Sequence, residues 1–158
     1  MDGWTSLLCR GILRAAMIST VAVGTDGSAT AAEAVKVASE VARRFDAEVM
    51  LVSAFQESGR APMDRGSSPE EVQWVFSPSA RVREILSRTE EGLQRDGIVC
   101  RTLVDEGDPA EVLVRLAVEC GADVLVIGNK GMGRRVLGSV PNSVTHRAPC
   151  SVLVVKTT

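Results

Sequence analysis

One glycine-rich segment, residues 128–139, contains the residue types that hold an anion. It reads GNKGMGRRVLGS. Glycines let the backbone come close to an anion and turn its N–H groups toward it. Gly138 and Ser139 stand where a predicted helix begins, and the first turn of a helix adds aligned donors and a partial positive charge. The segment therefore predicts an anion site, at which the Ser139 hydroxyl contacts a phosphate or caps the helix.

The spacing inside this segment differs from two common phosphate-binding patterns. Arg134 and Arg135 occupy the places where a Walker A motif has Lys and Ser or Thr. Gly131 and Gly133 lack the third glycine of G-x-G-x-x-G. Both arginines, together with Lys130, still supply cations around the segment. The alternative interpretation is a glycine-rich turn that only packing requires, and the residues alone leave both interpretations open.

A second loop with suitable chemistry is Gly24–Ser28, which follows the first predicted strand. At the carboxyl end of a strand, Asp26 would accept hydrogen bonds from ribose hydroxyls, as acidic residues do in other nucleotide folds. The alternative is that Asp26 forms the turn and binds the N–H groups of its own loop. The residues alone leave both roles of Asp26 open.

Catalytic and metal sites are not predicted. The chain has no paired carboxylates and no nucleophile beside a plausible base, and its one histidine, His146, is interpreted as a structural residue near a helix end. The four cysteines, at positions 9, 100, 120 and 150, are too widely spaced for a zinc site. We expect them to be reduced, mostly buried thiols in a cytoplasmic protein.

Composition limits the class of protein. Of the 158 residues 45% are hydrophobic and 24% charged, which is typical of one globular domain. A net charge of -2 gives no basic field for nucleic acid, and an aromatic content of 3% supplies few stacking platforms. The apolar runs are far shorter than the ~20 residues that cross a bilayer. We expect residues 1–16 to be a disordered extension and residues 17–158 to be the domain.

Apolar strands and amphipathic helices alternate along the domain. Strands are expected at 18–24, 47–55, 98–104, 123–127 and 151–156, and helices at 30–44, 82–97, 108–121 and 139–147. This alternation predicts an α/β fold in a single domain, with a doubly wound, five-stranded parallel sheet covered on both faces. Residues 56–79 are expected to form a surface excursion, in which Trp74 and Phe76 cover the core. In such sheets, ligands bind beyond the carboxyl ends of the strands, where both loops described above lie.

Local signals mark the helix ends. Thr30 and Glu33 have the spacing of a capping box. Asp108 suits the N-cap of a later helix and Pro109 its first position, while Gly121 suits a left-handed end. The apolar face of the first helix is expected to run from Ala34 to Phe45.

Three stretches resemble the universal stress protein family. They read VAVGTDGS, GDPAEVLVRLA and VLVIGNKGMGRRVLGSVPNSVTHRAPCSVLVVK, and the resemblance extends over residues 17–156. It implies the strand order 3-2-1-4-5, which places the first and fourth strands side by side. The two loops would then form one crevice.

The nucleotide-binding branch of that family is similar to this chain in the pattern G-x2-G-x9-G-[S/T]. The resemblance implies that the glycines and Ser139 line the phosphates with Val140 behind them, that Asp26 lies near adenosine, and that Ala54 and Ile127 flank adenine. The implied site comprises Gly24, Thr25, Asp26, Ala54, Ile127, Gly128, Asn129, Gly131, Gly138, Ser139 and Val140. Only six residues separate Gly131 from Gly138, so the loop is expected to be tighter or to hold the outer phosphates less strongly.

The leading hypothesis is therefore a cytoplasmic, nucleotide-responsive stress protein. Its ligand is an adenine nucleotide (ATP, AMP or cyclic AMP), with Mg²⁺ accompanying ATP. The alternatives are a slow ATPase and a protein–protein interaction module that binds no nucleotide. Neither nucleic acid nor a membrane is expected as a partner. A homodimer through the last strand, Ser151–Lys156, is expected because that strand is short, apolar and at the predicted sheet edge.

Overall fold

A computed structural model describes residues 18–57, 77–130 and 137–157 of the chain. The predictions made for residues 1–16, Trp74, Phe76 and Gly131 concern residues outside these ranges. Within them, no helix is both long and apolar enough to cross a membrane.

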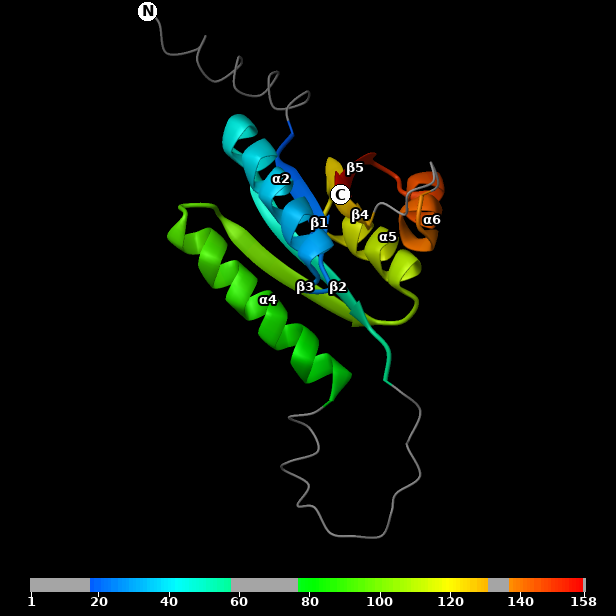
Figure 1. The fold of residues 1–158 in the computed structure, drawn as a ribbon. Coiled ribbons are helices and arrows are strands. Elements are labelled where there is room, and N and C mark those ends of the chain that lie inside the picture. Colours follow the sequence, from blue (N-terminus) through cyan, green and yellow to red (C-terminus); the bar gives the residue numbers. More distant parts are fainter. Residues whose placement is uncertain (1–17, 58–76, 131–136, 158) are drawn as a thin grey trace, which may run out of the picture.

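Five parallel strands form one sheet. They are β1 (Thr20–Gly24), β2 (Glu48–Phe55), β3 (Cys100–Glu106), β4 (Val124–Lys130) and β5 (Ser151–Thr157). Their order across the sheet is β3-β2-β1-β4-β5 (Figure 1). The predicted fold class and strand order are therefore confirmed, and β1 and β4 are neighbours in the centre of the sheet.

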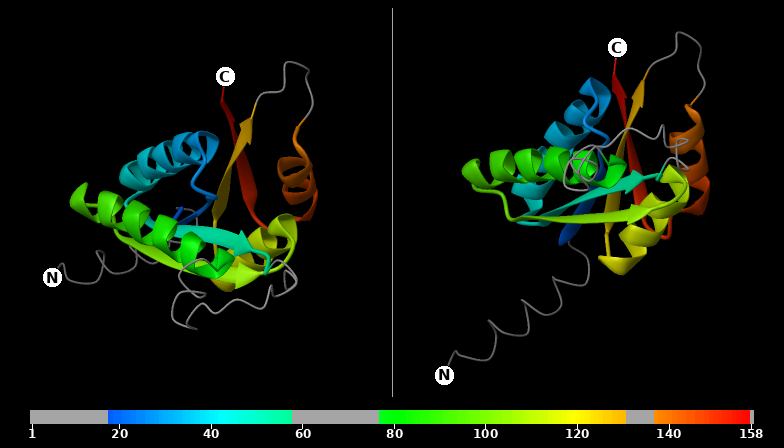
Figure 2. Two further views of the ribbon diagram at one scale, coloured as in Figure 1. Left: turned by 60° about the horizontal axis from the view of Figure 1, so that its bottom comes forward. Right: turned by 90° about the horizontal axis from the view of Figure 1, so that it is seen from below.

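Helices cover both faces of the sheet (Figure 2). They are α2 (Ala29–Phe45), α4 (Pro78–Arg95), α5 (Pro109–Glu119) and α6 (Ser139–Arg147). Helices α2 and α4 pack on one face and α5 and α6 on the other, and each face has its own hydrophobic core.

The central strands supply both cores because successive side chains point to opposite faces. Val21 and Val23 belong to the core under α2 and α4, while Ala22 between them belongs to the core under α5 and α6. All three side chains are fully buried. A strand that is buried on both faces reads as a continuous apolar run, which is how β1 was found in the sequence.

The predicted ends of α5 are confirmed. Asp108 is the N-cap and accepts hydrogen bonds from the backbone N–H groups of Ala110 and Glu111, at 3.0 and 3.2 Å. Pro109 is the first helical residue, and Gly121 has a φ of 63°, in the left-handed region. Local residue types alone therefore determine both ends of this helix.

The predicted capping box at Thr30 and Glu33 is wrong. Helix α2 begins at Ala29, and its N-cap is Ser28, whose Oγ accepts from the N–H of Ala31 at 3.1 Å. Thr30 instead lies within the first turn, where its hydroxyl contacts Thr157 of β5. A tertiary contact thus decides which of two hydroxyl residues caps the helix.

Two strand ends and one helix residue also differ from prediction. Strand β4 continues to Lys130, because Gly128, Asn129 and Lys130 pair with β5. Strand β3 begins at Cys100, since the N–H of Ile98 bonds back to α4. Phe45, expected in the core, is 39% exposed at the last position of α2.

Candidate functional site

A cavity of about 830 Å³ opens beyond the carboxyl ends of β1 and β4. The order of strands reverses between these two neighbours, which is where open α/β sheets place their ligands. Its volume falls within the range of about 300–1,000 Å³ that is usual for small-molecule sites. The residues around it come from the carboxyl ends of β1, β2 and β4, from the loops after β1 and before α6, and from the beginnings of α2, α5 and α6.

The structure brings ten of the eleven predicted site residues together around this cavity. They are Gly24, Thr25, Asp26, Ala54, Ile127, Gly128, Asn129, Gly138, Ser139 and Val140. The eleventh, Gly131, lies outside the described residues. The described residues of the two segments that were chosen for their chemistry therefore line one crevice, as the strand order implies.

Hydrogen bonds fix the loop after β1. The N–H of Thr25 donates to the carbonyl of Val52 at 3.0 Å, and Thr25 is 7% exposed. Asp26 Oδ1 accepts from the N–H of Ser28 at 2.9 Å, so its turn-forming role is observed. Asp26 is exposed, and among the described residues no hydrogen bond engages Oδ2. The turn holds the carboxylate beside the cavity with one oxygen left for a ligand.

Close packing explains the glycine at the end of β4. A Cβ added to Gly128 would lie 2.7 Å from both the carbonyl oxygen and Cγ2 of Thr30. Only glycine lets β4 approach the first turn of α2 this closely. Gly128 was predicted to open a loop, but it lies within the strand, where it pairs with Val155. Its closeness to α2 brings the two elements together along one wall of the cavity.

Helix α6 begins at the cavity without a side-chain cap. Its N-cap is Gly138, not Ser139, and within the described residues no side chain caps it. The N–H of Gly138 donates to Asn129 Oδ1 at 3.1 Å. Pro141 has no N–H, so Ser139 and Val140 supply the donors of this first turn, and neither has a partner among the described residues. By contrast, Ser28, Ser77 and Asp108 each cap their helices with a side chain.

Part of the cavity lining is apolar. Ile127 is 2% exposed, and Ala54 packs against the same hydrophobic core as Ile127 and α5. Sequence reasoning missed Pro109 and Leu113 of that helix, both of which line the cavity. A Cβ on Gly24 would lie 3.2 Å from the Leu113 side chain, so Gly24 leaves room for it. The position of α5 directly after β3 is the signal that predicts its first turn at this end of the sheet.

The charges around the cavity favour an anion at the α6 end. Lys130 lines the cavity there, and the helix end adds a partial positive charge. Asp26 is the acidic residue of the lining, on the β1 loop. The chemistry of this lining matches that of a molecule with a flat apolar part, hydroxyls and a phosphate. Across the described ranges, no three His, Cys, Asp or Glu residues are grouped to hold a metal ion.

His146 lies outside the cavity lining. It is exposed, and its Nδ1 is 2.8 Å from the carbonyl oxygen of Asn142, one turn earlier in α6. This local contact agrees with the structural interpretation of the residue.

The three thiols in the described part of the chain are protonated under ordinary conditions. Burial, together with the nearby Glu90, raises the pKa of Cys100 to about 12. Burial also raises the pKa of Cys120 and of Cys150, both half-buried. A reactive cysteine needs a lowered pKa, so these three are packing residues.

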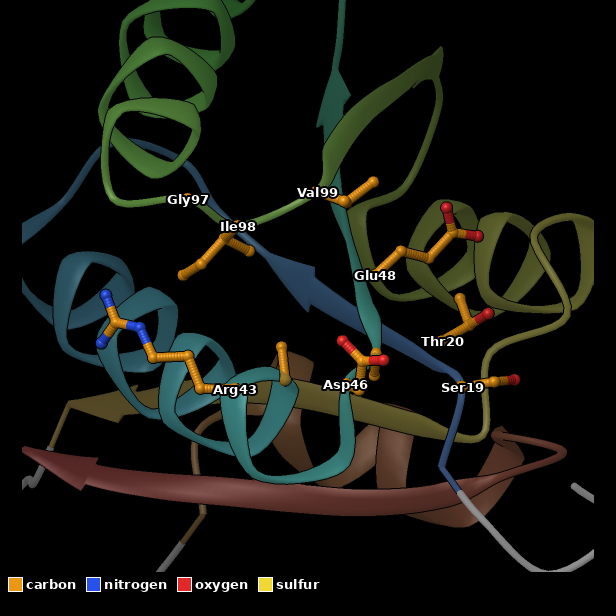
Figure 3. Close-up of a pocket in the computed structure, with 10 residues that line it drawn as sticks. Ser19, Thr20, Arg43, Asp46, Glu48, Gly97, Ile98 and Val99 are labelled. Atoms are coloured by element: carbon orange, nitrogen blue, oxygen red, sulfur yellow. The ribbon is translucent and has the colours of Figure 1, made fainter. Parts of the chain in front are cut away.

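A second cavity, of about 650 Å³, lies at the other end of the sheet, where β1 and β2 begin (Figure 3). Two of its charged side chains, Arg43 and Glu48, already have partners. Arg43 lies 3.7 Å from Asp96, and Glu48 accepts from Arg101 at 2.6 Å. Helices α2 and α4 end here, so they present carbonyl groups rather than N–H groups. This end of the sheet does not provide donors for a phosphate.

Asp123 stabilises this amino-terminal end. Its Oδ2 accepts from the N–H groups of Ser19 and Thr20, at 2.8 and 3.0 Å, and from the Ser19 hydroxyl at 3.0 Å. The hydrogen bond from the Ser19 backbone, helped by that from Thr20, lowers the pKa of the Asp123 carboxyl. Asp123 thus joins the start of β4 to the start of β1.

Residues 17–156 match the model of the universal stress protein family. A universal stress protein of Mycobacterium tuberculosis is 37% identical over 148 residues, covering 88% of this chain and 97% of that protein. One of Methanocaldococcus jannaschii is 32% identical over 139 residues, covering 86% of this chain and 81% of that protein.

Two solved structures share the fold. A universal stress protein in complex with cAMP is 28% identical with a TM-score of 0.66, covering 90% of this chain and 100% of that one. A universal stress protein family protein from Arabidopsis thaliana with AMP bound is 19% identical with a TM-score of 0.68, covering 89% of this chain and 92% of that one. The second likeness concerns the fold alone.

Proposed function

The chain belongs to the universal stress protein family, and from that premise we propose that it binds an adenine nucleotide in the cavity beyond β1 and β4. The base would lie against the apolar wall and the phosphate against the first turn of α6. The protein would act through this binding, as a nucleotide-responsive module in the stress response.

The observation that carries the proposal is the uncapped start of α6. Unpaired N–H groups at a helix end bind an anion readily, and here those of Ser139 and Val140 belong to a turn that lines the cavity. A side chain caps each of the other described helices. The phosphate would take the place of such a cap, with the Ser139 hydroxyl as a further donor.

The other parts of a nucleotide have matching partners. Ile127 and Ala54, with Leu113, offer an apolar slot for adenine, and the free Asp26 oxygen is available to ribose hydroxyls. The solved relative that is 28% identical is in complex with cAMP, which supports an adenine nucleotide as the ligand class.

Three adenine nucleotides are candidates for the ligand, namely AMP, cyclic AMP and ATP. AMP and cyclic AMP place a single phosphate near α6, whereas ATP needs room for two more and would bring Mg²⁺, held mainly by phosphates and water. The six residues between Gly131 and Gly138 favour the shorter ligands, because fewer backbone N–H groups remain for outer phosphates.

We also propose a homodimer through β5, in the cytoplasm. β5 is an edge strand of the sheet, and its Leu153 is 37% exposed. An unpaired edge with an exposed apolar side chain favours pairing with a second copy.

Thermal unfolding of nucleotide-stripped protein tests the proposal. AMP, cyclic AMP and ATP with Mg²⁺ are compared with GMP at equal concentration. A ligand at a hundredfold excess over its Kd adds about 2.7 kcal/mol, which raises the Tm of a domain of this size by about 5–10 °C. We expect this rise with at least one adenine nucleotide and less with GMP. No rise with any of them would contradict the proposal and favour an interaction module.

A further inference from the structure

The last described residue of β5, Thr157, reaches two residues of the cavity wall. Its Oγ1 lies 3.2 Å from the Thr30 hydroxyl oxygen and 3.2 Å from the carbonyl oxygen of Asn129. Both of these residues line the cavity, while Thr157 is outside its lining. A hydroxyl carries one hydrogen, and its oxygen also accepts. Both contacts have the geometry of a donation from Thr157, so its one hydrogen is shared between the Thr30 hydroxyl oxygen and the Asn129 carbonyl oxygen.

Asn129 extends this contact to helix α6. Its backbone carbonyl meets Thr157, and its side-chain Oδ1 accepts from the N–H of Gly138 at 3.1 Å. A continuous chain of hydrogen bonds therefore runs from β5 through Asn129 to the N-cap of α6. Gly138 is the residue that sets the direction of the free N–H groups behind it.

We propose that Thr157 is a positioning residue for the phosphate end of the site. Its hydroxyl holds Asn129 and Thr30 together, and Asn129 in turn holds the start of α6 at the distance a phosphate requires. The effect on binding rests on the proposed function, whereas the effect on Gly138 is a property of the unliganded protein. Because Thr157 acts only at the α6 end, loss of its hydroxyl should weaken the binding of AMP and leave the binding of adenosine unchanged.

The test uses T157V, in which a methyl replaces the hydroxyl at nearly constant volume and with good strand propensity. T157S keeps the hydroxyl and serves as the rescue. T89V is the matched control, since the Thr89 hydroxyl bonds only to the Ile85 carbonyl within α4 among the described residues. For each protein, titration calorimetry gives the Kd of AMP and of adenosine, and NMR gives the amide hydrogen exchange rate of Gly138.

In T157V we expect the Kd of AMP to rise about fivefold, which corresponds to about 1 kcal/mol, with the Kd of adenosine unchanged. We expect the exchange of the Gly138 amide to quicken by roughly the same factor, since the opening of that hydrogen bond becomes easier. T157S and T89V should behave as the wild type does in all three measurements.

Equal losses for AMP and adenosine, or an unchanged AMP affinity, would overturn the binding role of Thr157. If the wild type binds neither ligand, the proposed function fails and the Gly138 exchange rate alone decides. Faster exchange in T157V would then support the hydrogen-bond chain, and unchanged exchange would overturn it.

Discussion

The carbonyl oxygen of Thr30 lies 2.7 Å from the point at which a Cβ on Gly128 would stand. The first turn of α2 and the end of β4 therefore touch backbone to backbone, at the wall of the larger cavity. This contact joins two residues that lie far apart in the sequence, and the site geometry depends on it.

Gly128→Ala tests this contact. The added methyl cannot move past a backbone carbonyl, so we expect α2 and β4 to separate, at a cost of about 1–3 kcal/mol in the free energy of unfolding. Gly92→Ala in α4 is the control, because nothing lies within 4 Å of its added Cβ. That change should stabilise the protein by about 0.5–1 kcal/mol. Urea unfolding gives the free energy of unfolding of both variants. Equal effects of the two substitutions would contradict the account.

Gly138→Asp should separate stability from binding. The backbone at Gly138, with φ -59° and ψ 165°, suits any residue, and an added Cβ meets only ordinary contacts at 3.5 Å or more. An aspartate there would cap α6 itself and oppose a phosphate. We expect Gly138→Asp to be about 1 kcal/mol more stable than Gly138→Ala and to bind AMP roughly tenfold more weakly, as about 1.4 kcal/mol would give.

Thermal unfolding and AMP titration of both Gly138 variants make the comparison. An aspartate variant that gains stability and still binds AMP as the alanine variant does would show that the phosphate lies elsewhere.

Leu153→Asp should disrupt the proposed dimer. A carboxylate on the exposed face of β5 would be buried against a second copy, which is costly. Val118→Asp is the control, since Val118 is 59% exposed on α5, away from β5. Sedimentation equilibrium should show a monomer for Leu153→Asp and a dimer for Val118→Asp. A dimer that persists in Leu153→Asp would exclude this surface.

Asp123→Asn should change the acid sensitivity of the protein. The pKa of Asp123 is lowered in the folded state by the Ser19 and Thr20 N–H groups, so its contribution to stability is present above the unfolded pKa of about 3.9. It is lost as the pH falls through the folded pKa. We expect the variant to be less stable at pH 7, by at most about 1 kcal/mol because the carboxylate is exposed.

Urea unfolding between pH 7 and pH 2.5 tests the Asp123 prediction. The difference between wild type and Asp123→Asn should shrink as the pH drops below about 4. A difference that stays constant over this range would contradict the role given to the charge.

The sequence predicts those features of the fold that depend on neighbouring residues. Asp108, Pro109 and Gly121 define α5 because a cap, a fixed φ and a left-handed end are local properties. The predicted start of α2 was wrong because Ser28 and Thr30 both have side chains that can cap a helix. The contacts of Thr30 with Gly128 and Thr157, far away in the sequence, distinguish the two.

The same division holds for the site. Glycines and Ser139 were found by type and spacing, and the resemblance supplied Ala54 and Ile127. The contribution of Leu113 depends on how α5 packs, and that of Thr157 on the pairing of β5 with β4. Neither residue belongs to a local pattern, so only the fold reveals them.

The central claim is that an adenine nucleotide occupies the cavity at the start of α6. An NMR titration of the ¹⁵N-labelled, nucleotide-stripped protein with AMP tests it most directly, by following every assigned backbone amide. The account predicts saturable shifts that are largest at the Ser139 and Val140 amides, with no change at Ser19 and Gly97 beside the second cavity. Shifts that cluster at Ser19 and Gly97, or none up to millimolar AMP, would contradict it.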